Sequence, residues 1–343
     1  MKPTALGALC AALIATFLFA AERASAKDVL YVGSQRSGEI YVIDADTLEP
    51  VSILNIGFEV DDVVGSRDGK MVYGNAAIPN GNPLGRADSG VVYGIKTSTN
   101  KIVWWTAIPG VPQHLTVSAD GKRLFVPAID KNYIYVVDTA SGRIVESWPS
   151  IFGNHGTELS HDGRHLYVGN MFGRMILVYD VATGQVIANY PCREGVRPFK
   201  IDDAESRVYY QLSNLHGFEV LNIASGKVER VVDLPKLPSG VGADRNFTMD
   251  HGMALTPDGK MFLAAGSVVG YVAIYRLPDL SLVKTIPVGD DPNWIRVRAD
   301  SKFAYVSNRG SGDLSVIDLE KLVETRRIPI KKGVARFDVA AFE

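Results

Sequence analysis

The most constraining feature of this sequence is a pattern that returns seven times between Lys27 and the C-terminus. Each copy contains a short strand-like run with an aromatic residue, and then a β-branched run that ends in an acid, such as Ile134 to Asp138. The seven aromatic runs begin at Leu30, Met71, Leu124, Leu166, Val208, Met261 and Ala304. Period-two alternation with Asp-Gly and Ser-Gly turns is typical of antiparallel hairpins. The pattern therefore predicts an all-β protein without helices.

The spacing of the copies indicates how the strands are grouped. The turn residues Asp120 and Asp162 lie 42 positions apart, and 343 residues less the first 26 leave 317, or about 45 per copy. This period predicts a seven-bladed β-propeller of four-stranded antiparallel blades. The first copy begins near Asp28 at the second strand of a blade, and residues 334–342 form an alternating segment without a following partner. We expect this C-terminal strand to join the N-terminal blade and close the ring, which removes exposed strand edges.

The N-terminal segment has the features of a signal peptide. Lys2 gives a positive start, residues 5–21 carry no charge, and Ala24-Ser25-Ala26 fits the small-x-small site that signal peptidase cleaves. We therefore divide the chain into a signal peptide, 1–26, and a propeller, 27–343, in a periplasmic or secreted protein. An uncleaved anchor is the competing interpretation, because the apolar run nearly matches the thickness of a bilayer. No stable membrane span is expected after cleavage.

Composition narrows the range of partners. The 36 basic residues are balanced by 38 acidic ones, which excludes the strongly basic surface that nucleic-acid binding requires. Cys10 lies in the signal segment, so the propeller retains only Cys192 and forms no internal disulfide. We expect Cys192 to pack as a small apolar side chain, and Trp104, Trp105 and Trp148 to pack between blades.

The most regular copy carries a family resemblance. Residues 304–308, Ala-Tyr-Val-Ser-Asn, and 312–318, Gly-Asp-Leu-Ser-Val-Ile-Asp, resemble the YVTN repeat of bacterial and archaeal seven-bladed propellers, and residues 30–34 are similar. That family includes exported YncE-like proteins, the haem-binding cytochrome d1 domain, dehydrogenase subunits and lactonase-like propellers. The resemblance implies the fold across the propeller region and leaves the activity open, because sites are grafted onto such scaffolds.

A functional site is expected at the channel mouth, where the innermost strands begin. Two long connections, 78–89 and 236–250, are predicted to project over this mouth, and long loops on one face of a rigid ring commonly carry function. The candidate ligand-binding or catalytic residues are Asp61, Asp62, His114, His155, Glu158, Arg197, His251, Asn293 and Trp294. Acidic pairs such as Asp61-Asp62 either bind calcium or satisfy backbone amides in turns.

The histidines suggest the chemistry of this site, because neutral imidazole is a common ligand of transition metals. His155 and His251 stand five residues before the Ser or Thr of their turns, whereas His114 stands four before its own. Alternation therefore predicts that His155 and His251 share an orientation and favours two ligands over three. The competing hypothesis is that the imidazoles only bond to backbone and fix the blades. His161, His165 and His216 are expected to face solvent.

Three hypotheses for the function remain open. The first is a non-catalytic role in which the mouth binds a small molecule or an envelope protein. The second is an enzyme, either metal-dependent through His155 and His251, with His114 as a further ligand, or lactonase-like through His155 and an Arg197 anchor for a carboxylate. His251 and Pro257-Asp258-Gly259 resemble the motif of lactonase-like propellers, although His161 replaces the proline in the other copy. The third, implied by the cytochrome d1 resemblance, is non-covalent haem; the absence of Cys-x-x-Cys-His excludes covalent attachment.

Overall fold

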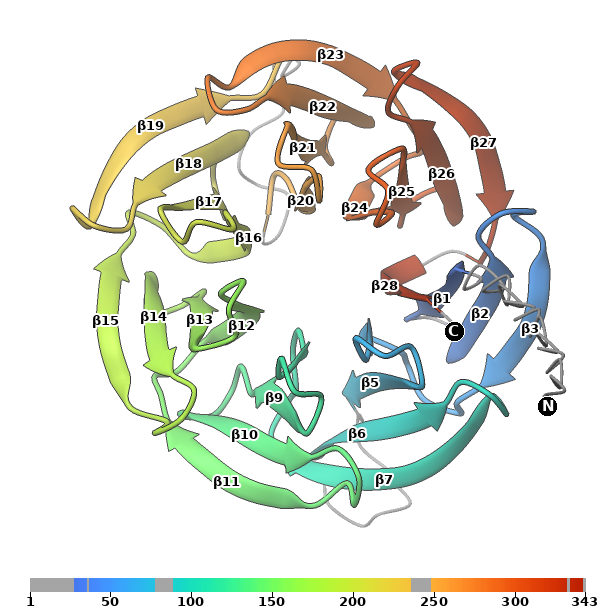
Figure 1. Ribbon diagram of the computed structural model, residues 1–343, viewed down its shortest axis with the longest axis vertical. Coiled ribbons are helices and arrows are strands. Elements are labelled where there is room, and N and C mark those ends of the chain that lie inside the picture. Colours follow the sequence, from blue (N-terminus) through green and yellow to red (C-terminus); the bar gives the residue numbers. More distant parts are fainter. Residues whose placement is uncertain (1–27, 36, 78–88, 236–247, 332–333, 342–343) are drawn as a thin grey trace, which may run out of the picture.

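Seven four-stranded antiparallel sheets form a ring around a central axis, as Figure 1 shows. The structure is a computed structural model that describes residues 28–35, 37–77, 89–235 and 248–331, and the backbone of 334–341. These residues form strands and turns without helices, and so contain no helix that could cross a membrane. The predicted seven-bladed propeller is confirmed. The predicted signal segment and most of the two long connections, 78–88 and 236–247, lie outside the described residues.

The 28 strands follow the predicted order, four to a blade. From the channel outward, the first blade contains β28 (Val334–Ala341), β1 (Asp28–Ser34), β2 (Glu39–Asp44) and β3 (Pro50–Asn55). The second contains β4 (Asp62–Gly65), β5 (Met71–Ala77), β6 (Ser89–Lys96) and β7 (Lys101–Pro109), and the third β8 (Thr116–Val117), β9 (Arg123–Pro127), β10 (Tyr133–Asp138) and β11 (Ile144–Pro149). The fourth contains β12 (Asn154–Leu159), β13 (His165–Asn170), β14 (Met175–Asp180) and β15 (Val186–Pro191), and the fifth β16 (Val196–Ile201), β17 (Arg207–Leu212), β18 (Gly217–Asn222) and β19 (Lys227–Asp233). The sixth contains β20 (Met253–Leu255), β21 (Met261–Gly266), β22 (Tyr271–Arg276) and β23 (Ser281–Pro287), and the seventh β24 (Pro292–Val297), β25 (Phe303–Asn308), β26 (Asp313–Asp318) and β27 (Val323–Pro329).

The ring closes as the sequence predicts, because the first blade combines both ends of the chain. β28 pairs with β1 in an antiparallel register that places Leu30 opposite Val339. Figure 1 shows β28 on the inner side of the ring beside β1, with β2 and β3 farther out. Leu30 also belongs to an apolar cluster with Tyr305 and Leu314 of the seventh blade, so packing and backbone pairing both hold the closure.

The aromatic residue of each repeat packs between neighbouring blades. One such side chain from each second strand is no more than 2% exposed: Tyr31, Tyr73, Phe125, Tyr167, Tyr209, Phe262 and Tyr305. The fourth strands alternate between exposed and half-buried positions, as β3 and β7 show. The aromatic repeat is therefore the sequence signal of the inter-blade core, and it fixes the blades that carry the channel.

Several innermost strands start with a register irregularity. The pairing of β12 with β13 skips His155, that of β16 with β17 skips Arg197 and Pro198, and that of β24 with β25 skips Asn293. An extra residue in one strand bends the backbone and re-aims the side chains around it. Residues at the channel mouth therefore do not follow the strict alternation that the sequence analysis assumes.

The structure tests the smaller sequence predictions. Trp148 is buried and Trp104 stacks on Tyr73, but Trp105 is 42% exposed although it also contacts other rings. Cys192 packs against the apolar cluster between the fourth and fifth blades, and burial raises the pKa of its thiol to about 12. His161 is exposed, as predicted.

Two of the histidines that were expected to face solvent lie elsewhere. The prediction is wrong for His216, which is buried with its Nδ1 2.9 Å from Asp250 Oδ2. His165 is half-buried, because its Nδ1 lies 2.6 Å from Glu205 Oε1. Each imidazole has a carboxylate partner from another strand or connection, a pairing across the fold that sequence spacing does not reveal.

Candidate metal centre

Three histidines from three different blades converge in the channel. The ring centroids of His114 and His155 are 4.5 Å apart, and that of His251 lies 6.0 and 5.9 Å from them. The Nε2 atoms of His114 and His155 are 3.3 Å apart, and one ligand atom from each of the three residues lies within 4.8 Å of the others. All three side chains are buried. Alternation predicts a shared orientation for His155 and His251 and a different one for His114, but all three rings face one another in the structure.

Backbone contacts between neighbouring inner strands explain the position of His114. Its N–H donates to the carbonyl oxygen of His155 over 3.2 Å, and its own carbonyl accepts from Thr157 Oγ1 over 2.7 Å. His114 precedes β8 and forms an isolated parallel bridge with Gly156, so it is not part of an alternating strand. The irregularity at His155 and this bridge together turn both imidazoles toward one another.

His251 is held by the backbone of the next blade. Its Nδ1 donates to the carbonyl oxygen of Asn293 over 2.9 Å, which leaves the lone pair on Nε2. Gly252 has a φ of +105°, and a Cβ there would lie 2.7 Å from the same carbonyl oxygen, so the close approach requires glycine. Asn293 therefore positions His251 through its backbone. This contact is the outer hydrogen bond that metal-ligating histidines usually make.

Burial keeps the imidazoles in the form that binds metals. It lowers the pKa of His155 well below 6.5, and the charges of His251 and Arg197 act in the same direction. Burial also lowers the pKa of His251 to about 3. Both rings are neutral at pH 7, so each offers an unprotonated nitrogen.

The donor set fits a transition metal that favours imidazole. With metal–nitrogen bonds of about 2.0–2.1 Å, two ligands of a tetrahedral ion are about 3.3–3.4 Å apart. The His114–His155 separation of 3.3 Å agrees with this value. The ligand atom of His251 lies within 4.8 Å of the other two, so it would have to approach by at most about 1.5 Å. The outer hydrogen bond is present at His251, but the buried Nδ1 atoms of His114 and His155 lack a partner among the described residues.

Arg197 and Trp294 border the histidine cluster. The Trp294 ring lies 5.8 Å from both His114 and His251. Arg197 is buried, its Nε donates to Ser213 Oγ over 3.0 Å, and it forms no ion pair with the acids of the described ranges. Burial lowers the pKa of its guanidinium to about 10, which still leaves it charged at neutral pH. A cavity of about 250 Å³ next to Arg197 is also lined by Phe172.

The predicted acids lie outside the histidine cluster. Glu158 Oε1 and Oε2 are 2.8 and 2.7 Å from the Lys200 ammonium. Asp62 accepts backbone N–H groups of Val63 and Leu115 over 2.9 and 2.6 Å, and Asp61 accepts from Gln35 over 2.6 Å. These contacts agree with the interpretation that the acidic pair satisfies amides.

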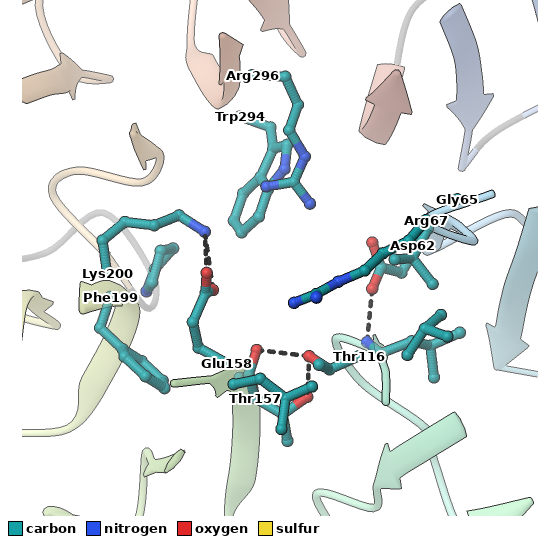
Figure 2. Close-up of a pocket in the computed structure, with 16 residues that line it drawn as sticks. Asp62, Gly65, Arg67, Thr116, Thr157, Glu158, Phe199, Lys200, Trp294 and Arg296 are labelled. Carbon is teal, nitrogen blue, oxygen red and sulfur yellow. Dashed lines mark hydrogen bonds and ion pairs between the residues drawn. The ribbon is translucent and has the colours of Figure 1, made fainter. Parts of the chain in front are cut away.

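A second channel cavity contains charged residues that the sequence analysis missed. It has a volume of about 240 Å³, and Trp294 lines it together with Arg67, Lys200 and Arg296 (Figure 2). None of the three histidines lines it, so Trp294 separates the cluster from this cavity. Most of the residues predicted from the sequence lie at strand starts. The available signal was a basic residue in the second half of an innermost strand, as at Lys200 and Arg296.

Comparisons with known proteins identify the fold. No known protein-family profile matches the sequence, and neither does any curated protein. The propeller is similar to the periplasmic gluconolactonase PpgL of Pseudomonas aeruginosa, with 16% identity, a TM-score of 0.74, and coverage of 92% of this chain and 99% of that one. It is also similar to a hydrazine synthase chain of Kuenenia stuttgartiensis, with 20% identity, a TM-score of 0.70, and coverage of 83% and 90%.

A third similar structure is the dihydro-haem d1 dehydrogenase NirN in a complex with DHE, with 16% identity, a TM-score of 0.61, and coverage of 90% of this chain and 64% of that one. At these identities the likeness establishes the fold alone. The protein is a seven-bladed propeller, and its fold is similar to those of NirN and of the gluconolactonase PpgL, as the sequence resemblance implied. On this fold, the chain brings three buried histidines together.

Proposed function

We propose that the protein is an exported, metal-binding propeller that holds a transition-metal ion between His114, His155 and His251. The observation that carries the proposal is the 3.3 Å separation of the Nε2 atoms of His114 and His155, with the third ligand atom within 4.8 Å. Imidazole donors suit zinc, copper, iron and nickel. Three protein ligands leave a coordination position open, and an ion bound in this way supplies Lewis-acid or redox chemistry.

Arg197 indicates that the same site also binds a small anionic ligand. Its guanidinium is buried without a carboxylate partner in the described part of the chain, and its charge contributes to the lowered pKa values of His155 and His251. A desolvated cation gains most from a charge-assisted hydrogen bond to an oxyanion. We therefore expect the ligand to occupy the 250 Å³ cavity beside Arg197.

Export is part of the proposal. It rests on the positive start, the uncharged run and the Ala24-Ser25-Ala26 site of the N-terminal segment. The similar gluconolactonase of Pseudomonas aeruginosa is itself named as periplasmic. Fractionation of the native host, with N-terminal sequencing of the mature chain, tests this component separately from metal binding.

Elemental analysis and metal titration test the central claim. We expect about one equivalent of metal in protein purified from its source, and about one equivalent of zinc or copper bound by the chelated protein in calorimetry. His155→Ala should weaken binding at least about a hundredfold, because it removes a ligand rather than an outer contact. His161→Ala is the matched control, since His161 is exposed. Equal affinities for the two variants would refute the site.

A lactonase-like enzyme is the second candidate. It is supported by the buried Arg197, whose charge helps to lower the pKa of His155. In such an enzyme Arg197 would anchor a carboxylate of the substrate, and the His155 imidazole would act as acid or base. A pH-stat assay with γ- and δ-lactones tests it. This candidate is supported if the wild-type protein hydrolyses a lactone and Arg197→Gln lowers the rate about tenfold or more. A wild-type protein that hydrolyses none of these lactones would exclude it.

Non-covalent haem is a weaker candidate, supported by the likeness to NirN. One of the three histidines would hold the haem iron, and the haem would supply redox chemistry there. The 3.3 Å separation of His114 and His155 matches two ligands of one bare ion, which favours the bare ion. A Soret absorbance band in protein from its source would favour haem over a bare ion.

A further inference from the structure

The charged cavity on the far side of Trp294 offers a second site with different chemistry. Figure 2 shows that it is bordered by the innermost strands of several blades. Arg67, Lys200 and Arg296 provide three positive charges, and Asp62 and Glu158 provide two negative ones. This concentration of charge contrasts with the neutral imidazoles of the histidine cluster.

Contacts within the cavity neutralise part of this charge. Glu158 forms a two-oxygen ion pair with Lys200 at 2.7 and 2.8 Å, and both side chains are largely shielded from solvent. Asp62 is buried and directs its two carboxylate oxygens at backbone N–H groups. Both acids therefore already have donors, and neither is directed at Arg67.

Arg67 is the residue best placed to bind a ligand. It is exposed and forms no hydrogen bond or ion pair with any residue of the described ranges. Figure 2 shows its guanidinium extending into the middle of the cavity, toward the space below Arg296. A guanidinium presents a planar set of donors that matches the two oxygens of a carboxylate or phosphate group.

The opposite wall of the cavity supplies an apolar surface and a second guanidinium. Arg296 lies over the Trp294 ring, with 5.3 Å between its guanidinium carbon and the ring centroid. Phe199 lines the same cavity. The cation–π contact places the guanidinium over the indole, so that an anionic group bound by Arg67 would lie near a second cation while the aromatic rings contact the rest of the ligand.

We propose that this cavity binds a small organic oxyanion, with its carboxylate or phosphate group between Arg67 and Arg296. The volume of about 240 Å³ lies below the range of about 300–1,000 Å³ for sites that bind drug-sized molecules. A compact ligand such as a dicarboxylate or a small phosphate compound therefore fits better than a sugar chain or a nucleotide. The site is separate from the metal centre and does not require a metal.

Calorimetry on the full, chelated chain in low-salt buffer tests the proposal, with succinate, citrate and inorganic phosphate as the three probes. We expect at least one probe to bind with a dissociation constant in the millimolar range or below. Arg67→Gln should weaken that binding about tenfold, through the loss of a charge-assisted contact. Preference for succinate or citrate identifies carboxylates as the ligand class, and preference for phosphate identifies phosphate compounds.

Matched variants separate a specific site from general attraction to charge. Arg143 is also exposed but lies on the hairpin between β10 and β11, and Arg143→Gln should leave binding unchanged. The chelated chain carries no metal, so failure of the metal proposal would not affect this result. Absence of binding for all three probes, or equal effects of Arg67→Gln and Arg143→Gln, would overturn the proposal.

Discussion

The two halves of the channel are built differently. In the histidine half, three buried imidazoles are held by irregular strand starts and by the bond from His251 to a backbone carbonyl. In the charged half, long side chains such as Arg67 and Lys200 extend from regular strands or turns into a cavity. The backbone thus determines geometry in one half, and side-chain charge determines chemistry in the other.

This difference indicates which ligands each half accommodates. Neutral nitrogens at a fixed separation suit a compact cation, whose bonds are short and directional. Long cationic side chains can adapt to ligands of different shapes, provided that the ligand carries an anionic group. Their charge-assisted hydrogen bonds remain strong over a range of ligand positions. One propeller channel can therefore offer both kinds of site, provided that something separates them.

Trp294 is the separating element, and its removal should have the largest effect. It is 6% exposed, contacts two of the histidines and lies under Arg296. Trp294→Ala should lower the free energy of unfolding by about 3–5 kcal/mol and weaken both metal and oxyanion binding. Denaturant unfolding measures the first effect. Trp105→Ala is the control, because its 42% exposure predicts a loss of about 1 kcal/mol.

A paired set of variants should separate the two halves. His155→Ala should cut metal affinity at least about a hundredfold and change succinate affinity less than about twofold. Arg67→Gln should cut succinate affinity about tenfold and change metal affinity less than about twofold, because Arg67 lines the charged cavity and is not one of the three clustered histidines or their ring contacts. Calorimetry of both variants with both probes measures the pattern. If either substitution weakened both ligands equally, the channel would be one site, and the comparison would be wrong.

The sequence predicts the architecture better than the site because the two depend on different information. Blade number, strand order and closure follow from repeated features, such as the aromatic residues near Tyr31 and Tyr305 and the unpartnered segment at 334–342. Because the same features recur in seven repeats, each repeat supports the structural interpretation of the others. Many small packing contacts favour the same arrangement, so one irregular copy does not change the fold.

The site depends on single irregularities that the repeat does not encode. Alternation predicts a different orientation for His114, but the bridge to Gly156 and the skipped position at His155 override it. His216 is another case, because its partner Asp250 comes from a connection 34 residues away. These contacts depend on how neighbouring blades meet, and sequence spacing within one blade does not contain that information.

The pH dependence of stability should also distinguish the two halves. In the folded chain burial lowers the pKa of His251 to about 3, whereas in the unfolded chain it is near 6.5. Below 6.5 the unfolded chain therefore binds the extra proton, and stability that is present at higher pH is lost as the pH falls. For metal-free protein we expect the free energy of unfolding to decrease by about 2 kcal/mol from pH 7 to pH 5 through His251.

Denaturant titrations at the two pH values measure this change, and His155 adds to it in the same direction. His251→Gln should show a smaller decrease, because glutamine does not titrate. Arg67→Gln should retain the full decrease, since arginine stays protonated throughout this range. Equal pH profiles for wild type and His251→Gln would show that the histidine half is more hydrated than its burial indicates.

The smallest expected effect concerns the charged half alone. Glu158→Gln removes the partner of Lys200 and adds one positive charge to the balance of the cavity. We expect succinate affinity to increase about threefold in low salt, and the gain to shrink as ionic strength rises and screens the charges. Glu59→Gln is the control, because Glu59 is exposed and outside the cavity lining. A loss of affinity in Glu158→Gln would mean that the ion pair positions Lys200 for the ligand rather than opposing it, and metal binding should be the same in both variants.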